Sequence, residues 1–402
     1  MELFLQFGHG MKGLSIELSK KWGGLTIILS PRDMAPDQML GWCQDFKKNN
    51  INCLFDPQCY CPKSKLKKLS QYKYWDTSLN TNLGSVDSRE TALIKEINEY
   101  NNIAETTFFI IPNILHDFSE SWKSDWVLRS RKLNIAARAE VKGKPILATL
   151  AIPSGFLMQR EDEIELLIQE ILEWDVDGYY IIAETPEKKY LVDNPLWLSN
   201  VFQLCAALKL ANKFIIYGYG NHQLLPLSLV KVDAIASGTW LNVRSFTNRF
   251  VDTDEMKRKN TWIYYPPSLS EYKLSFFDLA YSSGTIRYMQ PSSDFRDEYS
   301  DLIFKTKALP SATGLSETTA FKYYLSSLKK QLGDLVKPTY EATLSANEVL
   351  INTAEIAISQ LEKKGIFAQT RSFRDIVDVN RAAIQILDVS RGFSLSMSWN
   401  HL

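Results

Sequence analysis

Short runs of apolar residues recur along the first 240 residues of the chain, and each run ends in polar residues, glycine or proline. Hydrophobicity within the runs is continuous rather than alternating, which is typical of strands buried on both faces of a parallel sheet. Stretches with helical spacing separate the runs, so the pattern predicts an α/β fold, a (β/α)8 TIM barrel with a C-terminal helical region. The runs are 4–7, 26–29, 53–55, 108–111, 146–150, 178–182, 214–217 and 233–236.

Apolar residues at helical spacing predict helices between these runs and in the last quarter of the chain. Acidic residues in the first turns of 161–174 favour a helix there, because negative charge complements the dipole at a helix N-terminus. Gly365 and Gly392 stand where C-terminal caps are expected. The predicted helices are 36–48, 88–101, 117–138, 161–174, 196–210, a short one from 222, 319–335, 338–364 and 372–391.

Past residue 250 the chain becomes dense in aromatic residues and contains the pair Pro266-Pro267. This composition predicts an irregular excursion with two strands, before the pattern becomes helical again. We therefore expect three parts, a TIM-barrel domain at 1–250, an aromatic-rich irregular insertion at 251–315 and a C-terminal helical region at 316–402. A barrel of about 250 residues with an appendage suits the total length.

Charge and cysteine content exclude several classes of protein. Lys+Arg and Asp+Glu are both 46, so no global field attracts a polyanion, and nucleic-acid binding would need local basic patches. No apolar run approaches the roughly 18 residues of a membrane span, and the first residues lack a signal peptide's features. We expect a cytoplasmic protein without a membrane partner. We also expect no cofactor and no metal, because the cysteines lack zinc-ligand spacing. The chain has five cysteines, an odd number, and we expect their thiols to be reduced.

The polar residues that follow the strands are the candidate site, because the carboxyl ends of barrel strands meet at one mouth. Three carboxylates there have the chemistry for acid/base or glycosyl transfer: Asp33, Asp56 and Glu184. In the alternative interpretation, Asp33 pairs with its neighbour or caps a helix. The predicted substrate contacts are His9, Arg32, Gln58, Tyr60, Asn113, Ser154, Tyr219, Asn221, Ser237, Trp240 and Arg244.

Two basic clusters near this mouth are candidates for nucleic-acid binding. Lysines interleaved with aromatic residues follow the third strand, and a second cluster follows the eighth strand. Such mixtures suit phosphate contacts combined with base stacking, although an ordinary solvated surface has the same composition. The residues are Lys63, Lys65, Lys67, Lys68 and Lys73, among Tyr72, Tyr74 and Trp75, and then Arg249, Lys257, Arg258 and Lys259.

Several blocks stand in an order that is similar to one known family. Asp56 and Tyr60 match a strand ending in Asp-Ser-Gly-Gly-Phe. The Asp-Gly-Tyr at 177–179, followed by Glu184, matches a sixth strand, and Tyr-Gly-Tyr-Gly at 217–220 matches a seventh strand reading Met-Gly-Val-Gly. Across roughly residues 20–250 the chain thus resembles the queuine/archaeosine tRNA-guanine transglycosylase family.

This resemblance implies a glycosyltransferase that acts on an N-glycosidic bond in nucleic acid. Asp56 would then transfer a proton, while Asn113 and Gln58 would read the base. The family's nucleophilic aspartate falls at Ala236, so Asp33 or Glu184 would have to replace it. The family's zinc-binding C-x-C-x-x-C motif is missing from this sequence.

Three functions therefore remain open at the level of sequence. The first is a diverged transglycosylase-like transferase. The second is a catalytically inactive barrel that serves as a nucleic-acid-binding or assembly subunit. The third is a glycosyl or amide hydrolase that uses Asp56 and Glu184. A homodimer and a partner protein are both left open.

Overall fold

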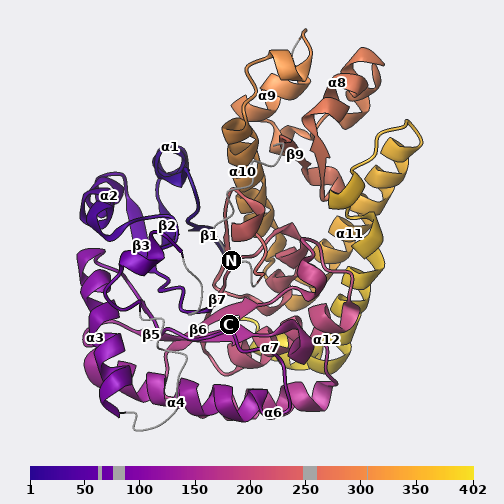
Figure 1. Ribbon diagram of the computed structural model, residues 1–402. Coiled ribbons are helices and arrows are strands. Elements are labelled where there is room, and N and C mark those ends of the chain that lie inside the picture. The colour runs from indigo at the N-terminus through magenta and orange to yellow at the C-terminus, as the bar shows by residue number, and fades with distance from the viewer. Residues whose placement is uncertain (62–65, 76–86, 248–259, 306) are drawn as a thin grey trace.

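The computed structural model describes residues 1–61, 66–75, 87–247, 260–305 and 307–402. At its centre, an 8-stranded parallel sheet curls into a nearly closed barrel surrounded by helices (Figure 1). Strands and helices alternate along the chain, which confirms the predicted (β/α)8 fold. The strands are β1 Glu2–Gln6, β2 Leu25–Leu29, β3 Ile51–Phe55, β4 Phe109–Ile110, β5 Ile146–Ile152, β6 Gly178–Ala183, β7 Phe214–Tyr217 and β8 Ala234–Ser237.

Neighbouring strands of the barrel pair in parallel, in the order β3-β2-β1-β8-β7-β6-β5-β4. This arrangement brings the carboxyl ends of the strands to one rim, as the site prediction requires. The order begins with β3 and ends with β4, so the gap in the barrel lies between these two strands. One backbone hydrogen bond crosses the gap, from the N–H of Thr107 to the carbonyl oxygen of Cys53 at 3.4 Å.

Strands β5 and β6 are covered on both faces. Every residue of β5 and of β6 is buried, which explains their unbroken apolar sequences. Gly178 opens β6 at a place where a Cβ atom would lie 2.2 Å from the carbonyl oxygen of Phe214. The close approach of β6 and β7 therefore depends on a residue without a side chain.

Helices cover the outside of the barrel and agree with most of the predicted ranges. The segment after β7 is a 3-10 helix, His222–Val230. The first helix was not predicted from sequence. The helices are α1 Met11–Trp22, α2 Pro36–Lys48, α3 Asp87–Ile103, α4 Trp122–Glu140, α5 Ser154–Leu157, α6 Glu161–Leu172 and α7 Pro195–Leu210.

The segment that follows the barrel forms a small unit with its own apolar cluster. Its two strands, β9 Trp262–Tyr265 and β10 Ser270–Lys273, pair antiparallel, which confirms the two predicted strands. Helices α8 Leu274–Ser282 and α9 Glu298–Phe304 follow, at the top of Figure 1, and neither was predicted. Residues of the hairpin and of both helices meet in one buried cluster that includes Ile263, Tyr272, Phe277 and Ile303. The predicted domain boundaries themselves stay a prediction.

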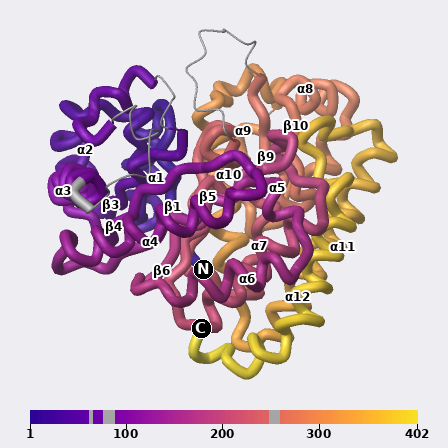
Figure 2. The backbone as a smooth tube through the Cα atoms, turned by 60° about the horizontal axis from the view of Figure 1, so that its bottom comes forward, coloured from indigo at the N-terminus to yellow at the C-terminus, as the bar shows by residue number. Residues whose placement is uncertain are grey.

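Three long helices complete the chain: α10 Glu317–Leu335, α11 Tyr340–Glu362 and α12 Val377–Ser398. Helices α11 and α12 run along one edge of the molecule in both views (Figures 1 and 2). Gly365 follows α11 with a left-handed φ of 78°, as the predicted cap requires. The cap predicted at Gly392 is wrong, because this glycine is buried inside α12, which continues to Ser398.

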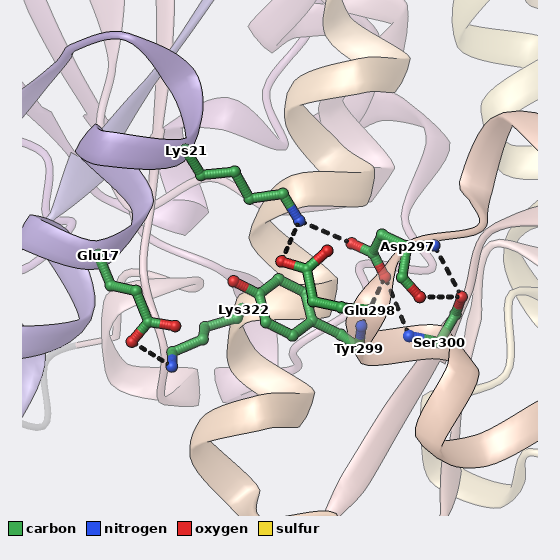
Figure 3. Close-up of polar contacts among 7 residues, drawn as sticks. All are labelled: Glu17, Lys21, Asp297, Glu298, Tyr299, Ser300 and Lys322. Atoms are coloured by element: carbon green, nitrogen blue, oxygen red, sulfur yellow. Dashed lines mark hydrogen bonds and ion pairs between the residues drawn. The ribbon is translucent and has the colours of Figure 1, made fainter. Parts of the chain in front are cut away.

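Ion pairs connect the barrel to the later helices at α1 (Figure 3). The Nζ atom of Lys21 lies 3.2 Å from Asp297 and 2.9 Å from Glu298 at the start of α9. The same amine lies 4.2 Å from the centre of the Tyr299 ring. Glu17 of α1 accepts from Lys322 of α10 at 2.5 Å. Segments about 300 residues apart in the chain thus meet at these partly exposed ion pairs, each of which contributes at most about 1 kcal/mol.

Candidate active site at the carboxyl ends of the strands

A buried carboxyl group lies where strand β3 ends. Asp56 directly follows β3, and its side chain is 0% exposed. One carboxyl oxygen accepts from the Tyr60 hydroxyl at 2.6 Å and from the backbone N–H of Gln58 at 2.9 Å. The other accepts from the hydroxyls of Tyr180 at 3.2 Å and Tyr219 at 3.1 Å. Asp56 is therefore enclosed by hydrogen-bond donors from different strands.

The barrel geometry brings these donors together. Tyr180 lies inside β6 and Tyr219 follows β7, and the Tyr180 hydroxyl also lies 3.0 Å from the side-chain oxygen of Gln6 in β1. Burial raises the pKa of the Asp56 carboxyl to about 6, although the hydrogen bonds from its neighbours favour the charged form. The carboxyl can thus exchange a proton near neutral pH, which is what general acid/base chemistry needs.

Asp56 is linked to a second carboxyl group through side chains. Gln58 donates to the Tyr219 hydroxyl at 3.0 Å and accepts from the Ser30 hydroxyl at 3.1 Å. Ser30 in turn lies 3.2 Å from a carboxyl oxygen of Asp33. Burial also raises the pKa of Asp33, against the opposing effect of Arg32. The two acids form the ends of one hydrogen-bonded chain.

Two residues of this series of hydrogen bonds have a backbone conformation that residues other than glycine rarely adopt. Gln58 has φ 53° and Tyr219 has φ 54°, both in the left-handed region. Bulky residues in this region are strained by about 1–3 kcal/mol and persist where the surrounding structure requires them. The two strained residues contact each other and Asp56, so two of the ten non-glycine residues with positive φ in the described structure lie at the candidate site.

An aromatic cover closes the site. Phe246 packs its ring 5.2 Å from the rings of both Tyr60 and Tyr219, measured between centroids. The backbone of Phe246 is held by Thr185, whose N–H donates to its carbonyl oxygen at 3.0 Å. A cavity of about 10 Å³ lies beside Tyr219 and Phe246, which is room for about one water molecule. A substrate that reaches Asp56 must therefore displace part of this cover.

The third predicted carboxylate has a different environment. Glu184 accepts from the backbone N–H and the hydroxyl of Ser154 at 3.0 and 3.1 Å, at the start of α5. Its carbonyl oxygen accepts from the indole of Trp197 at 2.9 Å. These contacts connect the ends of β5 and β6 and use one of the two carboxyl oxygens.

Asn113 is buried against helix α4 and strand β5. Its amide group donates to the hydroxyl of Ser130 and to the carbonyl oxygen of Thr149, at 3.0 and 2.9 Å. Its side-chain oxygen accepts from the N–H of Ile114 at 2.9 Å. The side-chain amide of Asn113, which we predicted to read a base, thus makes its hydrogen bonds to other groups of the protein.

A second buried charge cluster lies beyond the rim. Arg244 donates to the carbonyl oxygen of Gly238 at 2.8 Å and lies 3.4 Å from Glu271 of β10. Arg371 and the Tyr190 hydroxyl also bind Glu271, each at 2.7 Å. Burial opposes ionisation of Glu271, but the two arginines outweigh it and hold its pKa at about 2. Arg244, a predicted substrate contact, thus joins the barrel to the hairpin.

The remaining predicted contacts are spread around the rim. His9 is exposed, and the backbone N–H of Arg32 donates to the side chain of Gln58 at 3.0 Å. Asn221 donates to the carbonyl oxygens of Tyr190 and Arg244, each at 3.0 Å. Ser237 is buried at the end of β8, and the Trp240 ring packs against Phe321 of α10.

The first basic cluster is only partly available to a ligand. Lys67 and Lys73 are exposed, and Lys73 pairs with Glu99 at 3.5 Å. Lys68 donates to the carbonyl oxygen of Asp33 at 2.7 Å. The aromatic residues of this cluster are buried, so they are not available to stack on bases: Tyr72, Tyr74 and Trp75. Outside the described residues lie Lys63, Lys65, Arg249, Lys257, Arg258 and Lys259.

Seven residues of the site and the charge cluster were missed in the sequence, namely Gln6, Ser30, Tyr180, Tyr190, Phe246, Glu271 and Arg371. Gln6 and Tyr180 lie within strands, whereas the predicted site residues all follow a strand. Their signal was a polar group inside an apolar run, which must find a partner when it is buried. Phe246 and Glu271 come several residues or more after the last barrel strand in the sequence, and no pattern in the sequence indicates their roles.

Within the described ranges, no three His, Cys, Asp or Glu side chains gather in a group that could hold a metal ion. No helix there has the length and apolarity needed to cross a bilayer. The five cysteines are free thiols. No protein-family model matches the chain, and no curated protein matches it either.

Proposed function

We propose that this protein is a diverged transglycosylase-like enzyme that acts on an N-glycosidic bond in nucleic acid, with Asp56 as its general acid/base. The observation that carries the proposal is the enclosure of the Asp56 carboxyl by three tyrosine hydroxyls at the carboxyl ends of the barrel strands. The position of Asp56 in the sequence resemblance supports it as well.

Breaking an N-glycosidic bond needs a proton for the departing base, and base exchange needs that proton removed from the incoming one. A carboxyl group that ionises near pH 6 can serve in both directions. Tyr60 and the other hydroxyls fix its orientation before substrate arrives. Asp33 is our candidate for the second carboxylate, because the chain through Ser30 and Gln58 connects it to Asp56.

The test measures release or exchange of a radiolabelled base from tRNA and from DNA. We expect Asp56→Asn to lower the rate by about 100-fold or more, the usual contribution of a general acid/base. Asp45→Asn, which removes a carboxylate paired with Lys12 on the outer helices, is the matched control and should leave the rate unchanged. Equal rates for Asp56→Asn and wild type would refute the proposal.

A pH profile adds a second readout. The Tyr60 hydroxyl favours the charged form of Asp56, so Tyr60→Phe should raise the pKa of this carboxyl above about 6. The pH at which activity changes should then shift upward, while the circular dichroism spectrum stays the same. An unshifted profile would mean that a group other than Asp56 controls the reaction.

A catalytically inactive nucleic-acid-binding subunit is the second candidate. Two observations favour it: Ala236 stands at the position of the family's nucleophile, and the cavity beside Tyr219 measures about 10 Å³. This function predicts salt-sensitive binding of RNA or DNA that Lys67→Glu weakens and Asp56→Asn does not. Turnover of a small substrate without nucleic acid would instead support a hydrolase.

A further inference from the structure

The side-chain amide of Gln6 makes a hydrogen bond at only one of its two ends. Gln6 is the last residue of β1 and is 0% exposed, and its side-chain oxygen accepts from the Tyr180 hydroxyl at 3.0 Å. Within the described ranges, its side-chain nitrogen Nε2 has no acceptor. A buried N–H group has lost its hydrogen bonds to water, so native proteins rarely keep one without a partner.

The hydroxyl of Tyr180 has one hydrogen and two acceptors. It lies 3.0 Å from Oε1 of Gln6 and 3.2 Å from Oδ2 of Asp56, and a hydroxyl can donate to only one of them. The other hydroxyl at Oδ2 belongs to Tyr219, which lies at 3.1 Å and accepts from Gln58. The direction of the Tyr180 hydrogen therefore depends on whether Asp56 carries a hydrogen of its own.

The two states of Asp56 require two orientations of the Gln6 amide. A protonated Asp56 can donate to the Tyr180 oxygen, and Tyr180 then donates to Oε1 of Gln6, which is the orientation in the structure. An ionised Asp56 only accepts, so it takes the Tyr180 hydrogen. The oxygens of Tyr180 and Gln6 would then face each other at 3.0 Å with no hydrogen between them. Turning the amide over about its last side-chain bond replaces Oε1 by Nε2, which donates to Tyr180.

The titratable groups around Asp56 keep their protons in this pH range. Burial is the largest cause that raises the pKa of each of them, far above neutral. They are Tyr60, Tyr74, Tyr180, Tyr219 and Cys59. The groups that carry charge lie further along the hydrogen-bonded chain, at Asp33 with Arg32 and His9 near it. Ser30, Gln58 and Tyr219 separate Asp33 from Asp56, so the proton of Asp56 itself decides where the Tyr180 hydrogen points.

We propose that Gln6 is a positioning residue for Asp56, with an amide group that turns over whenever this carboxyl group gains or loses its proton. Both states then keep the hydrogen bonds between Gln6, Tyr180 and Asp56. General acid/base catalysis in two directions needs both states of the carboxyl group. This use of the amide rests on the proposed function, whereas the turning of the amide does not.

Neutron diffraction tests the orientation directly, because it locates deuterium and distinguishes nitrogen from oxygen, which X-ray data rarely do. At pH 4, below the pKa of Asp56 of about 6, Oε1 of Gln6 should face Tyr180, and at pH 8 Nε2 should face it. Gln223 is the internal control. It is buried too, but both ends of its amide bind the backbone of Val192 at 2.7 Å, so its orientation should stay the same. One orientation of Gln6 at both pH values would overturn the proposal.

Nuclear magnetic resonance in solution identifies the group responsible. The side-chain amide signals of Gln6, assigned by their loss in Gln6→Met, should move with a midpoint near the Asp56 pKa of about 6. Asp56→Asn should abolish this movement. Tyr180→Phe removes the hydroxyl but keeps the charge of Asp56, and it should abolish most of the movement. An amide that moves as much in Tyr180→Phe as in wild type senses only the charge, which would refute the role of the hydroxyl.

These measurements separate the inference from the proposed function, because neither of them needs a substrate. An amide that turns in a protein that releases no base would support the inference and refute the proposed function. A fixed amide, in a protein whose base release is abolished by Asp56→Asn, would refute the inference and leave the proposed function in place.

Discussion

Asp56 shows how a fold changes the chemistry of a single residue. A carboxylate that is taken out of water loses hydration worth several kcal/mol, and hydrogen bonds recover only part of it. Four donors contact Asp56, yet burial is the larger effect and its pKa rises to about 6. The folded protein therefore holds the proton of Asp56 up to a higher pH than the unfolded chain does. The proposed acid/base role needs an ionisable carboxyl group at this position, whereas burial of its charged form lowers the stability of the folded protein.

Asp56→Asn should stabilise the protein relative to wild type as the pH rises. Between pH 3.8 and about 6 the folded protein holds a proton that the unfolded chain releases, so wild-type stability falls across this window. Asparagine has no charge to bury. The difference in unfolding free energy, measured by urea at pH 4 and pH 7, should grow in favour of the variant by up to about 3 kcal/mol. A difference that is equal at both pH values would show that charge is not the cause.

For single residues, the sequence predicted which side chains lie at the ends of the strands better than it predicted their hydrogen-bond partners. Asp56, Gln58, Tyr60 and Tyr219 were found because residues after parallel strands share a rim. Tyr180 was not found, because its place in an apolar run says nothing of the direction of its hydroxyl. The role of Arg244 could not be anticipated either, since its partner is 27 residues away in a hairpin.

At the scale of elements, burial decides what a sequence reveals. The barrel strands were predictable because both of their faces are covered. Helix α8 was not, because its apolar residues pack in a separate cluster beside a hairpin that sequence patterns described as irregular. The error at Gly392 has a different cause. This glycine stands inside α12 where a Cβ atom would lie 2.5 Å from Asp388, so close packing rather than a helix end explains it.

Gly178→Ala should destabilise the protein by about 2–3 kcal/mol, because the added methyl group must push β7 away from β6. Gly13→Ala is a matched control, since a Cβ atom there meets nothing within 4 Å in helix α1. That control should stabilise the helix by about 0.5–1 kcal/mol. Thermal unfolding of both variants measures the difference. Similar effects of the two substitutions would contradict the close approach of the strands.

For the whole molecule, buried charge joins parts that lie far apart in the chain. Glu271 of the hairpin binds Arg244 next to the barrel and Arg371 before α12. Nothing in the sequence pairs these three residues, because they are scattered over more than 100 positions. Only the packing of the appendage on the barrel brings them into contact.

Glu271→Gln should cost about 3–5 kcal/mol at pH 7, because it leaves two arginines without their carboxylate. The pKa of Glu271 is lowered to about 2 from 4.5, so its contribution is present above pH 4.5 and is lost as pH falls through 2. Urea unfolding at pH 7 and pH 3 should therefore show a smaller penalty at pH 3. Additive losses in an Arg244→Met, Glu271→Met cycle would argue against direct pairing.

The gap between β3 and β4 has a mechanical consequence. A barrel whose sheet closes without interruption can change its circumference only by breaking a ladder of hydrogen bonds. This one has two free margins, bridged by the bond from Thr107 to Cys53 at 3.4 Å. Small expansions can be taken up there while every other strand keeps its register. Because Asp56 directly follows β3, this margin of the sheet borders the buried candidate site.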